Sequence, residues 1–332
     1  MGVLVEGEWV EDGYRRDEQG RFQRDESRFH GWIGPEGRFP PEAGRYHLYV
    51  SLACPWAHRV LIMRRLKGLE PVISVSVAHP VMGEGGWAFR GGFPGATTDP
   101  ILGAEHLHQV YTAADPQASG RVTVPALWDC KERTLVNNES RELLRMLDHA
   151  FDGLATYEVD LAPESLREQV DATIDALYEP VNNGVYRCGF AGTQQAYEEA
   201  ADALYAALDH WDRILGGRRY LCGERLTEAD ICLYTTLIRF DAVYAIHFKC
   251  SQRAVREYPN LMAYLRELYQ MPAFRGTTDF EHIRHHYYRS HPSLNPQGII
   301  ARMPELGLEQ PPRRRCGRRL LEAELRHARD DP

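Results

Sequence analysis

Hydrophobic and polar positions along the chain follow two patterns, and the change between them falls near residue 160. Between 46 and 155, short apolar runs alternate with amphipathic segments, which indicates a mixed α/β domain. Strands are predicted over 46–53, 71–78, 122–129 and 134–137, and helices over 55–67, 106–114 and 139–149. Between 160 and 290, apolar residues recur every three or four positions, which predicts helices over 165–178, 193–215, 227–245 and 261–271. The pattern therefore predicts a small α/β domain followed by an all-helical domain.

Three segments lie outside this alternation. Residues 1–45 are rich in Gly, Arg, Glu and aromatic residues, show little periodicity, and are predicted to form an extended N-terminal segment. Residues 79–105 carry many Gly and Pro and form a long insertion, of a kind that is usually functional or disordered inside a compact domain. Residues 291–332 form a Pro- and Arg-rich tail. We expect its basic run at 313–319 to be solvated rather than an interaction segment, with a short helix over 320–328.

Cys54 carries the most chemical information in the sequence. It follows the predicted strand and precedes Pro55, and proline is favoured at the first position of a helix. The thiol is therefore expected at a helix N-terminus, where the helix dipole favours the thiolate. Position 57 is alanine, so no Cys-x-x-Cys pair exists for dithiol exchange. Any disulfide chemistry must take its second thiol from elsewhere, most simply from glutathione.

Two further features suggest a peptide-like ligand near this cysteine. Val124-Pro125 begins an apolar run, and a cis peptide bond there would turn the preceding backbone polar groups toward a ligand. Glu139 and Ser140 stand at the start of the predicted helix 139–149, where backbone N–H groups can hold a carboxylate. Taken alone, the second feature also fits a simple helix cap. The order of the three features favours the ligand site.

Composition narrows the class of protein. The chain of 332 residues has 43% hydrophobic and 26% charged residues, as in an ordinary globular protein of about two domains. A formal net charge of -8 argues against nucleic acid as the main partner. No apolar run is long enough to predict a membrane span, and the acidic N-terminus shows no secretory signal. Seven cysteines without paired spacing favour reduced thiols and the cytoplasm.

The motifs resemble those of the glutathionyl-hydroquinone reductases, the omega-like Xi class of glutathione transferases. The resemblance covers about residues 30–300 and is carried by seven blocks in the right order, at 54–57, 93–97, 120–125, 137–140, 181–186, 239–244 and 285–292. It implies the glutathione-transferase architecture: a thioredoxin-like domain over 46–155, with its insertion, and a helical substrate domain over 160–290. It also implies a homodimer, with glutathione as co-substrate and no metal.

The resemblance implies a role for individual residues. Cys54 is the nucleophile, Tyr186 gives or takes the proton of the hydroquinone, and Tyr244 and Tyr287 line the same pocket and lower the pKa of the thiol. The residues implied to bind glutathione are Trp87, Arg121, Val122, Thr123, Val124, Glu139 and Ser140. One departure is visible, because many relatives carry an arginine where this chain has residues 107–110, Leu-His-Gln-Val. That difference concerns the affinity for glutathione rather than the chemistry.

The implied reaction is the reductive deglutathionylation of glutathionyl-hydroquinones through a mixed disulfide between Cys54 and glutathione. Ionising a free cysteine to about 90% at neutral pH requires about 3.5 kcal/mol, and a helix N-terminus supplies at most about 2 kcal/mol. Backbone N–H groups and the hydroxyls of Tyr244 and Tyr287 are the predicted additional donors to the sulfur, so Tyr287→Phe is expected to raise the pKa of the thiol. The alternatives are an omega-like thioltransferase acting on mixed disulfides and a glutathione-binding scaffold without catalysis.

Other conspicuous residues have plainer interpretations. The histidines at 282, 285, 286 and 291 lack nearby cysteine or carboxylate ligands at tight spacing, so we expect no metal site there. The cysteines other than Cys54 are expected to be core residues or incidental thiols, although Cys188 lies close enough to Tyr186 to line the pocket.

Overall fold

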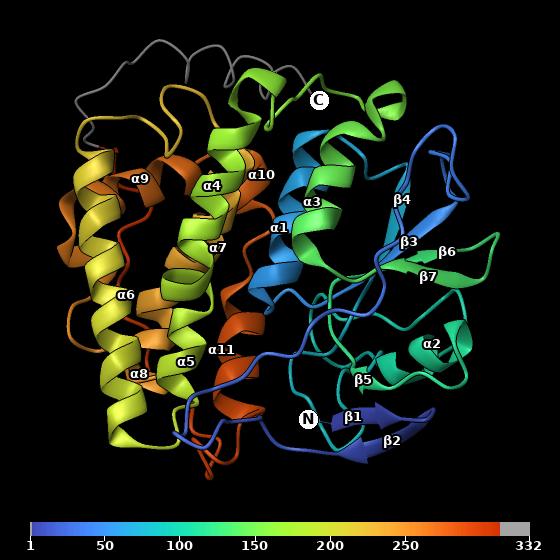
Figure 1. Cartoon of the computed structure of the whole chain (residues 1–332), viewed down its shortest axis with the longest axis horizontal. Coiled ribbons are helices and arrows are strands. Elements are labelled where there is room, and N and C mark those ends of the chain that lie inside the picture. Colours follow the sequence, from blue (N-terminus) through green and yellow to red (C-terminus); the bar gives the residue numbers. More distant parts are fainter. Residues whose placement is uncertain (1, 313–332) are drawn as a thin grey trace.

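The computed structural model describes residues 2–312, and Figure 1 shows a four-stranded sheet on one side and a set of helices on the other. The sheet has the strand order β4-β3-β6-β7, formed by β3 (Tyr46–Val50), β4 (Ile73–Val77), β6 (Ala126–Asp129) and β7 (Thr134–Asn137). Strands β3 and β4 are parallel, and β6 and β7 are antiparallel to their neighbours. Every residue of β3 is buried, as expected for a central strand.

Two helices lie between this sheet and the helical domain, α1 (Pro55–Leu66) and α3 (Ser140–His149) (Figure 1). Helix α2 (Leu107–Ala114) packs near β7. The predicted strands and helices of this domain are therefore confirmed, with ends that differ by a few residues. The predicted strand over 122–129 is the exception, because only Ala126–Asp129 pairs with β3 and Gly120–Arg121 forms β5 in a separate sheet.

The helical domain is built around α7 (Glu228–Arg239), which is buried along its whole length. At its start the N–H and the hydroxyl of Thr227 both donate to the Asp230 carboxylate, at 2.8 and 2.9 Å. The predicted helix 227–245 is interrupted, because η4 (Phe240–Tyr244) is a π-helical turn before the short α8 (Ala245–His247). The other helices are α4 (Arg167–Leu177), α5 (Gly184–Gly189), α6 (Gln194–Leu215), α9 (Pro259–Tyr269), α10 (Pro272–Arg275) and α11 (Phe280–Arg289), with a second π-helical turn η3 (Tyr178–Asn182) and 3-10 turns η1 (Asp152–Leu154), η2 (Glu164–Leu166) and η5 (Val255–Glu257).

The N-terminal segment is more structured than the sequence predicted. It begins with a hairpin of β1 (Gly2–Val5) and β2 (Glu8–Glu11), whose two turn residues, Glu6 and Gly7, both have positive φ. Strand β1 pairs with β5 (Gly120–Arg121), so this segment joins the loop before the sheet. The chain then crosses to the helical domain (Figure 1), where the Arg16 side chain donates to the carbonyl of Phe190 at 2.7 Å.

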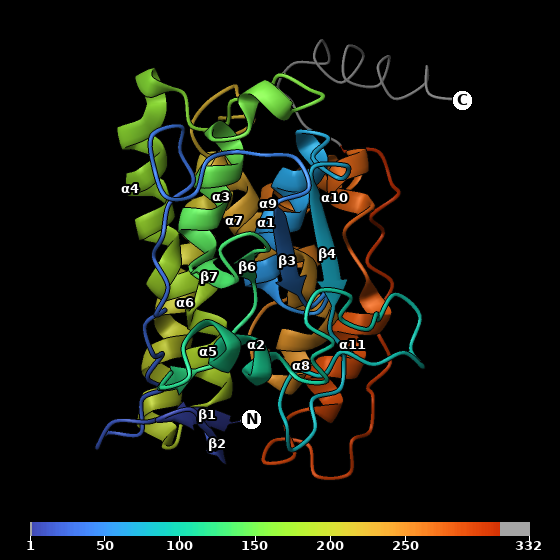
Figure 2. The same cartoon turned by 90° about the vertical axis from the view of Figure 1, so that its right-hand side faces the viewer.

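The insertion 79–105 contains no helix or strand but is tied to α11 (Figure 2). The ring of His286 hydrogen-bonds to the Pro80 carbonyl at 3.0 Å, and His282 hydrogen-bonds to the Pro94 carbonyl at 2.7 Å. Met82 N–H donates to the hydroxyl of Ser290 at 3.0 Å. These contacts bring the insertion of the first domain to the last helix of the second. No helix among residues 2–312 is long and apolar enough to cross a membrane.

Candidate active site

Cys54 occupies the position that the sequence predicted, immediately before α1. Its backbone is extended, Pro55 begins the helix, and the side chain is 8% exposed. The thiol donates a hydrogen bond to the carbonyl of Val124, with Sγ and O 3.4 Å apart. The Val124-Pro125 peptide bond is cis, as the sequence suggested. The cysteine and the cis-proline loop therefore face each other across the end of the sheet.

The electrostatic environment of Cys54 differs from the prediction. Burial raises the pKa of the Cys54 thiol, and this effect is larger than those that lower it. The opposing groups are the backbone N–H groups of Trp56 and Ala57 and the positive charges of Arg239 and Arg24. The predicted lowering of the pKa is therefore wrong for the thiol as it lies here, because burial of the sulfur outweighs the helix N-terminus and the nearby positive charges.

Three tyrosines gather beside the thiol. The hydroxyl oxygens of Tyr186 and Tyr287 are 2.6 Å apart, and those of Tyr244 and Tyr287 are 3.0 Å apart. Tyr186 and Tyr287 line the cavity that contains Cys54, whereas Tyr244 is fully buried and is not among the residues that line it. The prediction that Tyr244 lines the pocket is therefore wrong. It lies behind Tyr287 and contacts it through the hydroxyl.

All three tyrosines are held in the neutral form. Burial raises the pKa of Tyr186 and of Tyr287 well above the ordinary value, and it raises the pKa of Tyr244 to about 12. Neutral hydroxyls can donate a proton or a hydrogen bond at neutral pH. Their described hydrogen bonds run to one another and not to the sulfur, which corrects the prediction that Tyr244 and Tyr287 donate to the thiol.

The cavity beside Cys54 has a volume of about 140 Å³. A cavity of about 150 Å³ accommodates benzene, so the space suits one aromatic ring. Trp87 of the insertion forms part of its wall and stacks on His286, with ring centroids 4.8 Å apart. Val122, Thr123 and Val124 also line it. Part of the predicted glutathione site therefore shares one cavity with Cys54, Tyr186 and Tyr287.

Arg121 lines the same cavity but is already paired with carboxylates. Its Nε lies 3.0 Å from Asp25, and one of its terminal nitrogens lies 2.8 Å from Asp12. Both acidic residues belong to the N-terminal segment. The guanidinium therefore anchors that segment, and its predicted contact with glutathione stays a prediction.

A second cavity adjoins the first and contains Glu139 and Ser140 at the start of α3. Glu139 accepts a hydrogen bond from the Arg141 N–H at 3.2 Å, so the helix-cap interpretation is confirmed. Its other carboxylate oxygen accepts from Ser27 at 2.9 Å. Thr123 and Val124 line both cavities, which makes a continuous path from Glu139 to Cys54. That path has the chemistry expected of a site for an extended tripeptide with an ammonium group at one end.

Comparisons with known proteins agree with this geometry. Residues 53–150 match the glutathione S-transferase N-terminal domain, and residues 194–267 match the glutathione S-transferase C-terminal domain. The glutathionyl-hydroquinone reductase YqjG of Escherichia coli K12 is 51% identical, over 94% of this chain and 98% of that protein. The glutathionyl-hydroquinone reductase PcpF of Sphingobium chlorophenolicum is 50% identical, over 90% of this chain and 95% of that protein.

Solved structures give the same answer. The Xi-class glutathione transferase from Natrialba magadii has a TM-score of 0.88 at 50% identity, covering 94% of this chain and 95% of that one. The glutathione-bound structure of E. coli YqjG has a TM-score of 0.87 at 48% identity, covering 94% and 99%. The chain belongs to the Xi-class glutathione transferases. The predicted fold, a thioredoxin-like domain followed by a helical domain, is confirmed.

In this Xi-class transferase the N-terminal segment contributes residues that sequence reasoning missed. Tyr14, Phe22 and Arg24 line the cavity of Cys54, and Arg24 also lines the second cavity. The Arg24 guanidinium lies 4.9 Å from the Trp56 ring and 4.8 Å from the Tyr186 ring. Its Nε donates to the Asn183 side chain at 2.9 Å. The signal in the sequence was the mixture of arginines and aromatics in a stretch with no helical or strand period.

His108, in the segment 107–110 where the resemblance led us to expect an arginine, is not among the residues that line either cavity. Its ring stacks between those of Trp9 and His106, with centroids at 4.8 and 5.4 Å. The His108 ring therefore packs the N-terminal hairpin against α2 and does not contribute to the wall of either cavity.

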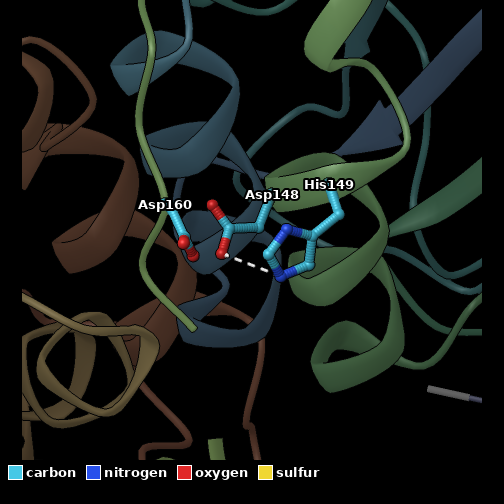
Figure 3. A group of neighbouring side chains, drawn as sticks. All are labelled: Asp148, His149 and Asp160. Atoms are coloured by element: carbon cyan, nitrogen blue, oxygen red, sulfur yellow. Dashed lines mark ion pairs between the residues drawn. The ribbon is translucent and has the colours of Figure 1, made fainter. Parts of the chain in front are cut away.

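The histidines of α11 and of the residues just after it serve packing and hydrogen bonding. His282 and His286 bind carbonyls of the insertion, and His291 is 2.9 Å from His247. Among residues 2–312, the side chains close enough together to hold a metal ion are those of Asp148, His149 and Asp160, which point toward one another in Figure 3. Leu161 N–H donates to both carboxylate oxygens of Asp148 at 3.2 and 3.0 Å. We interpret this group as structural: it holds the segment around Leu161 against the C-terminal end of α3.

The other described cysteines are reduced, and four of the five are buried: Cys188, Cys222, Cys232 and Cys250, with Cys130 half-buried. Cys188 is buried and is not among the cavity residues, so it is a core residue as expected and the alternative place in the pocket is excluded. Cys316, the basic run and the predicted helix of the tail lie outside the described residues.

Proposed function

We propose that this protein is a glutathionyl-hydroquinone reductase, which removes glutathione from glutathionyl-hydroquinones and releases the hydroquinone. The observation that carries the proposal is the meeting of Cys54 with the hydroxyls of Tyr186 and Tyr287 in one cavity of aromatic-ring size. A thiol supplies the nucleophile and a neutral phenol supplies the proton. The relatives named as glutathionyl-hydroquinone reductases support the same assignment.

The reaction begins when the Cys54 thiolate attacks the sulfur of the substrate's thioether. A sulfur–sulfur bond forms, the bond from sulfur to the ring carbon breaks, and its electron pair passes to that carbon. Tyr186 donates a proton to the carbon, which yields the hydroquinone. Tyr287 stabilises the Tyr186 phenolate through the hydrogen bond of 2.6 Å.

The second half regenerates the enzyme. The thiolate of a second glutathione attacks the glutathione sulfur of the mixed disulfide, so oxidised glutathione leaves and the Cys54 thiolate returns. The electrons that reduced the ring carbon therefore come from two glutathione sulfurs. Tyr186 regains its proton from solvent or from the incoming thiol.

Glutathione lies, in this proposal, along the path that joins the two cavities. Glu139 pairs with the ammonium group of the γ-glutamyl unit, and Ser140 with the N-terminal end of α3 holds its carboxylate. The backbone of Val124 pairs with the cysteinyl unit, and Trp87, Arg121, Val122 and Thr123 flank it. The support is that all of these residues line the two cavities.

The test compares two substrates at equal glutathione: a glutathionyl-hydroquinone and the mixed disulfide of glutathione with 2-mercaptoethanol. The proposal expects a higher kcat/KM for the first substrate, and Tyr186→Phe should lower that value while sparing the second. An omega-like thioltransferase, the second candidate, is favoured by relatives with omega-like names. It would prefer the mixed disulfide and be insensitive to Tyr186.

We further propose a homodimer that works in the cytoplasm without metal, nucleic acid or membrane. Sedimentation velocity tests the dimer, and cell fractionation tests the location. A monomer at micromolar concentration contradicts the first proposal.

A further inference from the structure

Arg239 is a buried cation at the boundary of the two domains. It is the last residue of α7 and is 0% exposed. Its Nε donates to the Ala53 carbonyl at 2.9 Å, and one terminal nitrogen donates to the Leu52 carbonyl at 3.1 Å. These two carbonyls belong to the residues directly before Cys54. An arginine of the helical domain therefore holds the chain segment that presents the nucleophile.

The remaining donors of Arg239 bind neutral groups. The other terminal nitrogen donates to the Thr235 carbonyl at 2.8 Å and contacts His58 Nδ1 at 3.0 Å. His58 is fully buried, and burial holds its pKa well below the ordinary value, so the ring is neutral. Its Nε2 is 3.0 Å from Thr277, whose hydroxyl donates onward to the Ala273 carbonyl. Nε2 therefore carries the proton, and Nδ1 accepts from Arg239.

No carboxylate lies within ion-pair distance of Arg239 among the residues that the structure describes. Two other buried arginines have such a partner: Arg45 lies 2.6 Å from Asp129, and Arg219 lies 2.6 Å from Glu267. The buried Arg59 has none among the described residues, and its guanidinium donates to the Asn182 side chain at 2.9 Å. An uncompensated buried charge is costly, and it is retained where the charge is used. The group beside it that becomes an anion during the reaction is Cys54.

We propose that Arg239 is a positioning residue for the nucleophile, which fixes the Leu52–Ala53 backbone and supplies the permanent positive charge that stabilises the Cys54 thiolate. The proposal rests on the role of Cys54 given above. It explains why a fully buried arginine has no acidic partner, because its partner is the thiolate itself. Its charge also lowers the pKa of Tyr244 and Tyr287, so it favours each anion that the reaction forms at this site.

Other groups around the thiol do not replace this charge. Arg24 is the second cation, but it is only half-buried and lies against the rings of Trp56 and Tyr186. Arg121 is neutralised by Asp12 and Asp25. Arg15 also lines the cavity and is paired with Asp25 at 2.9 Å. The remaining titratable groups that face the thiol or line its cavity are tyrosines and histidines: Tyr14, Tyr186, Tyr244, Tyr287, His286 and His291. Burial keeps both histidines neutral by lowering their pKa.

The test is the pH dependence of Cys54 alkylation by iodoacetamide in the full chain, followed by peptide mass spectrometry. Arg239→Gln keeps donor groups but removes the charge, so the alkylation midpoint should rise by about one pH unit or more, a roughly tenfold loss of thiolate below the midpoint. Arg239→Lys restores the charge, and its midpoint should lie within about half a unit of the parent. The lysine variant should still lose turnover, because one ammonium cannot hold both carbonyls in the same geometry.

Arg64→Gln is the matched control. Arg64 also donates to two backbone carbonyls, those of Ile73 at 2.7 Å and Glu70 at 3.2 Å, but it belongs to the far end of α1. Its substitution should leave the alkylation midpoint unchanged. A folded Arg239→Gln protein with the parent midpoint overturns the proposal. If that variant does not fold, the lysine variant decides, and a rise of a full unit in its midpoint overturns the charge role.

Failure of this proposal differs from failure of the proposed function. If the parent protein forms the glutathione adduct on Cys54 but the Arg239 variants have the same alkylation midpoint as the parent, only the role of Arg239 is wrong. If the parent protein forms no adduct, the function itself is wrong.

Discussion

The phenylalanine substitution of Tyr287 separates the two roles that its hydroxyl can play. The hydroxyl lies 2.6 Å from that of Tyr186 and 3.0 Å from that of Tyr244. Burial is the main reason that the pKa of Tyr186 is raised, and the hydrogen bond from Tyr287 works in the opposite direction. Tyr287→Phe should therefore make Tyr186 a weaker acid while leaving the sulfur environment unchanged.

The magnitude follows from the charge on Tyr186. A hydrogen bond to a charged group contributes about 1.5–3 kcal/mol, and each 1.4 kcal/mol is a tenfold change in rate. The kcat for a glutathionyl-hydroquinone should fall roughly 10- to 100-fold. Tyr244 loses its partner inside the core, so the free energy of unfolding should also fall by about 1–3 kcal/mol.

The assay measures hydroquinone release by chromatography and Cys54 alkylation across pH in the same protein. The expected result is a lower kcat with an unchanged alkylation midpoint. Tyr234→Phe is the control, because this buried tyrosine of α7 also loses one hydroxyl contact, to Thr278 at 2.9 Å, away from the cavity. An alkylation midpoint that rises by a unit in Tyr287→Phe would show that the hydroxyl acts on the thiol instead of on Tyr186.

Three further variants test the roles of Cys54, Arg24 and Asp148. Cys54→Ser should abolish turnover and the glutathione adduct with little change in melting temperature; residual turnover above about one thousandth of the parent rate would point to another nucleophile. Arg24→Gln removes the guanidinium over the Tyr186 ring and should lower kcat/KM about tenfold. Arg253→Gln removes a similar contact with Tyr258, which does not line the cavity, and should leave kcat/KM unchanged. Burial raises the pKa of Asp148 to about 6, so the folded state keeps a proton that the unfolded state loses above about pH 4. The stabilising contribution of that proton is complete below about pH 4 and is lost as the pH rises to 6. In urea titrations the free energy of unfolding should therefore fall over this pH range in the parent protein and fall less in Asp148→Asn. An identical pH dependence in both proteins contradicts this prediction.

Sequence periodicity predicted the parts of the fold that repeat. The apolar run before Cys54, the proline after it and the polar cap at Thr227 each act within a few residues, so strand β3 and helices α1 and α7 were predictable. The π-helical turn at Phe240–Tyr244 was not, because its extra backbone residue leaves no periodic mark.

Site residues that belong to a local sequence motif were predicted, and those placed by contacts between distant segments were missed. Cys54, Tyr186 and Glu139 lie as expected because each stands at the end of an element or in a recognised block. The burial that raises the pKa of the thiol, the position of Tyr244 behind Tyr287, and the carboxylates around Arg121 depend on contacts between distant segments. Arg24 and Arg239 were missed for the same reason, since their partners are more than a hundred residues away.

Mass spectrometry of the intact protein after brief incubation with a glutathionyl-hydroquinone, without free glutathione, is the direct test of covalent catalysis by Cys54. Attack of the Cys54 thiolate on the substrate sulfur predicts one adduct of about 305 Da on Cys54, removable by glutathione, with one equivalent of free hydroquinone. An unmodified protein, or an adduct with the mass of the aromatic ring, would contradict it.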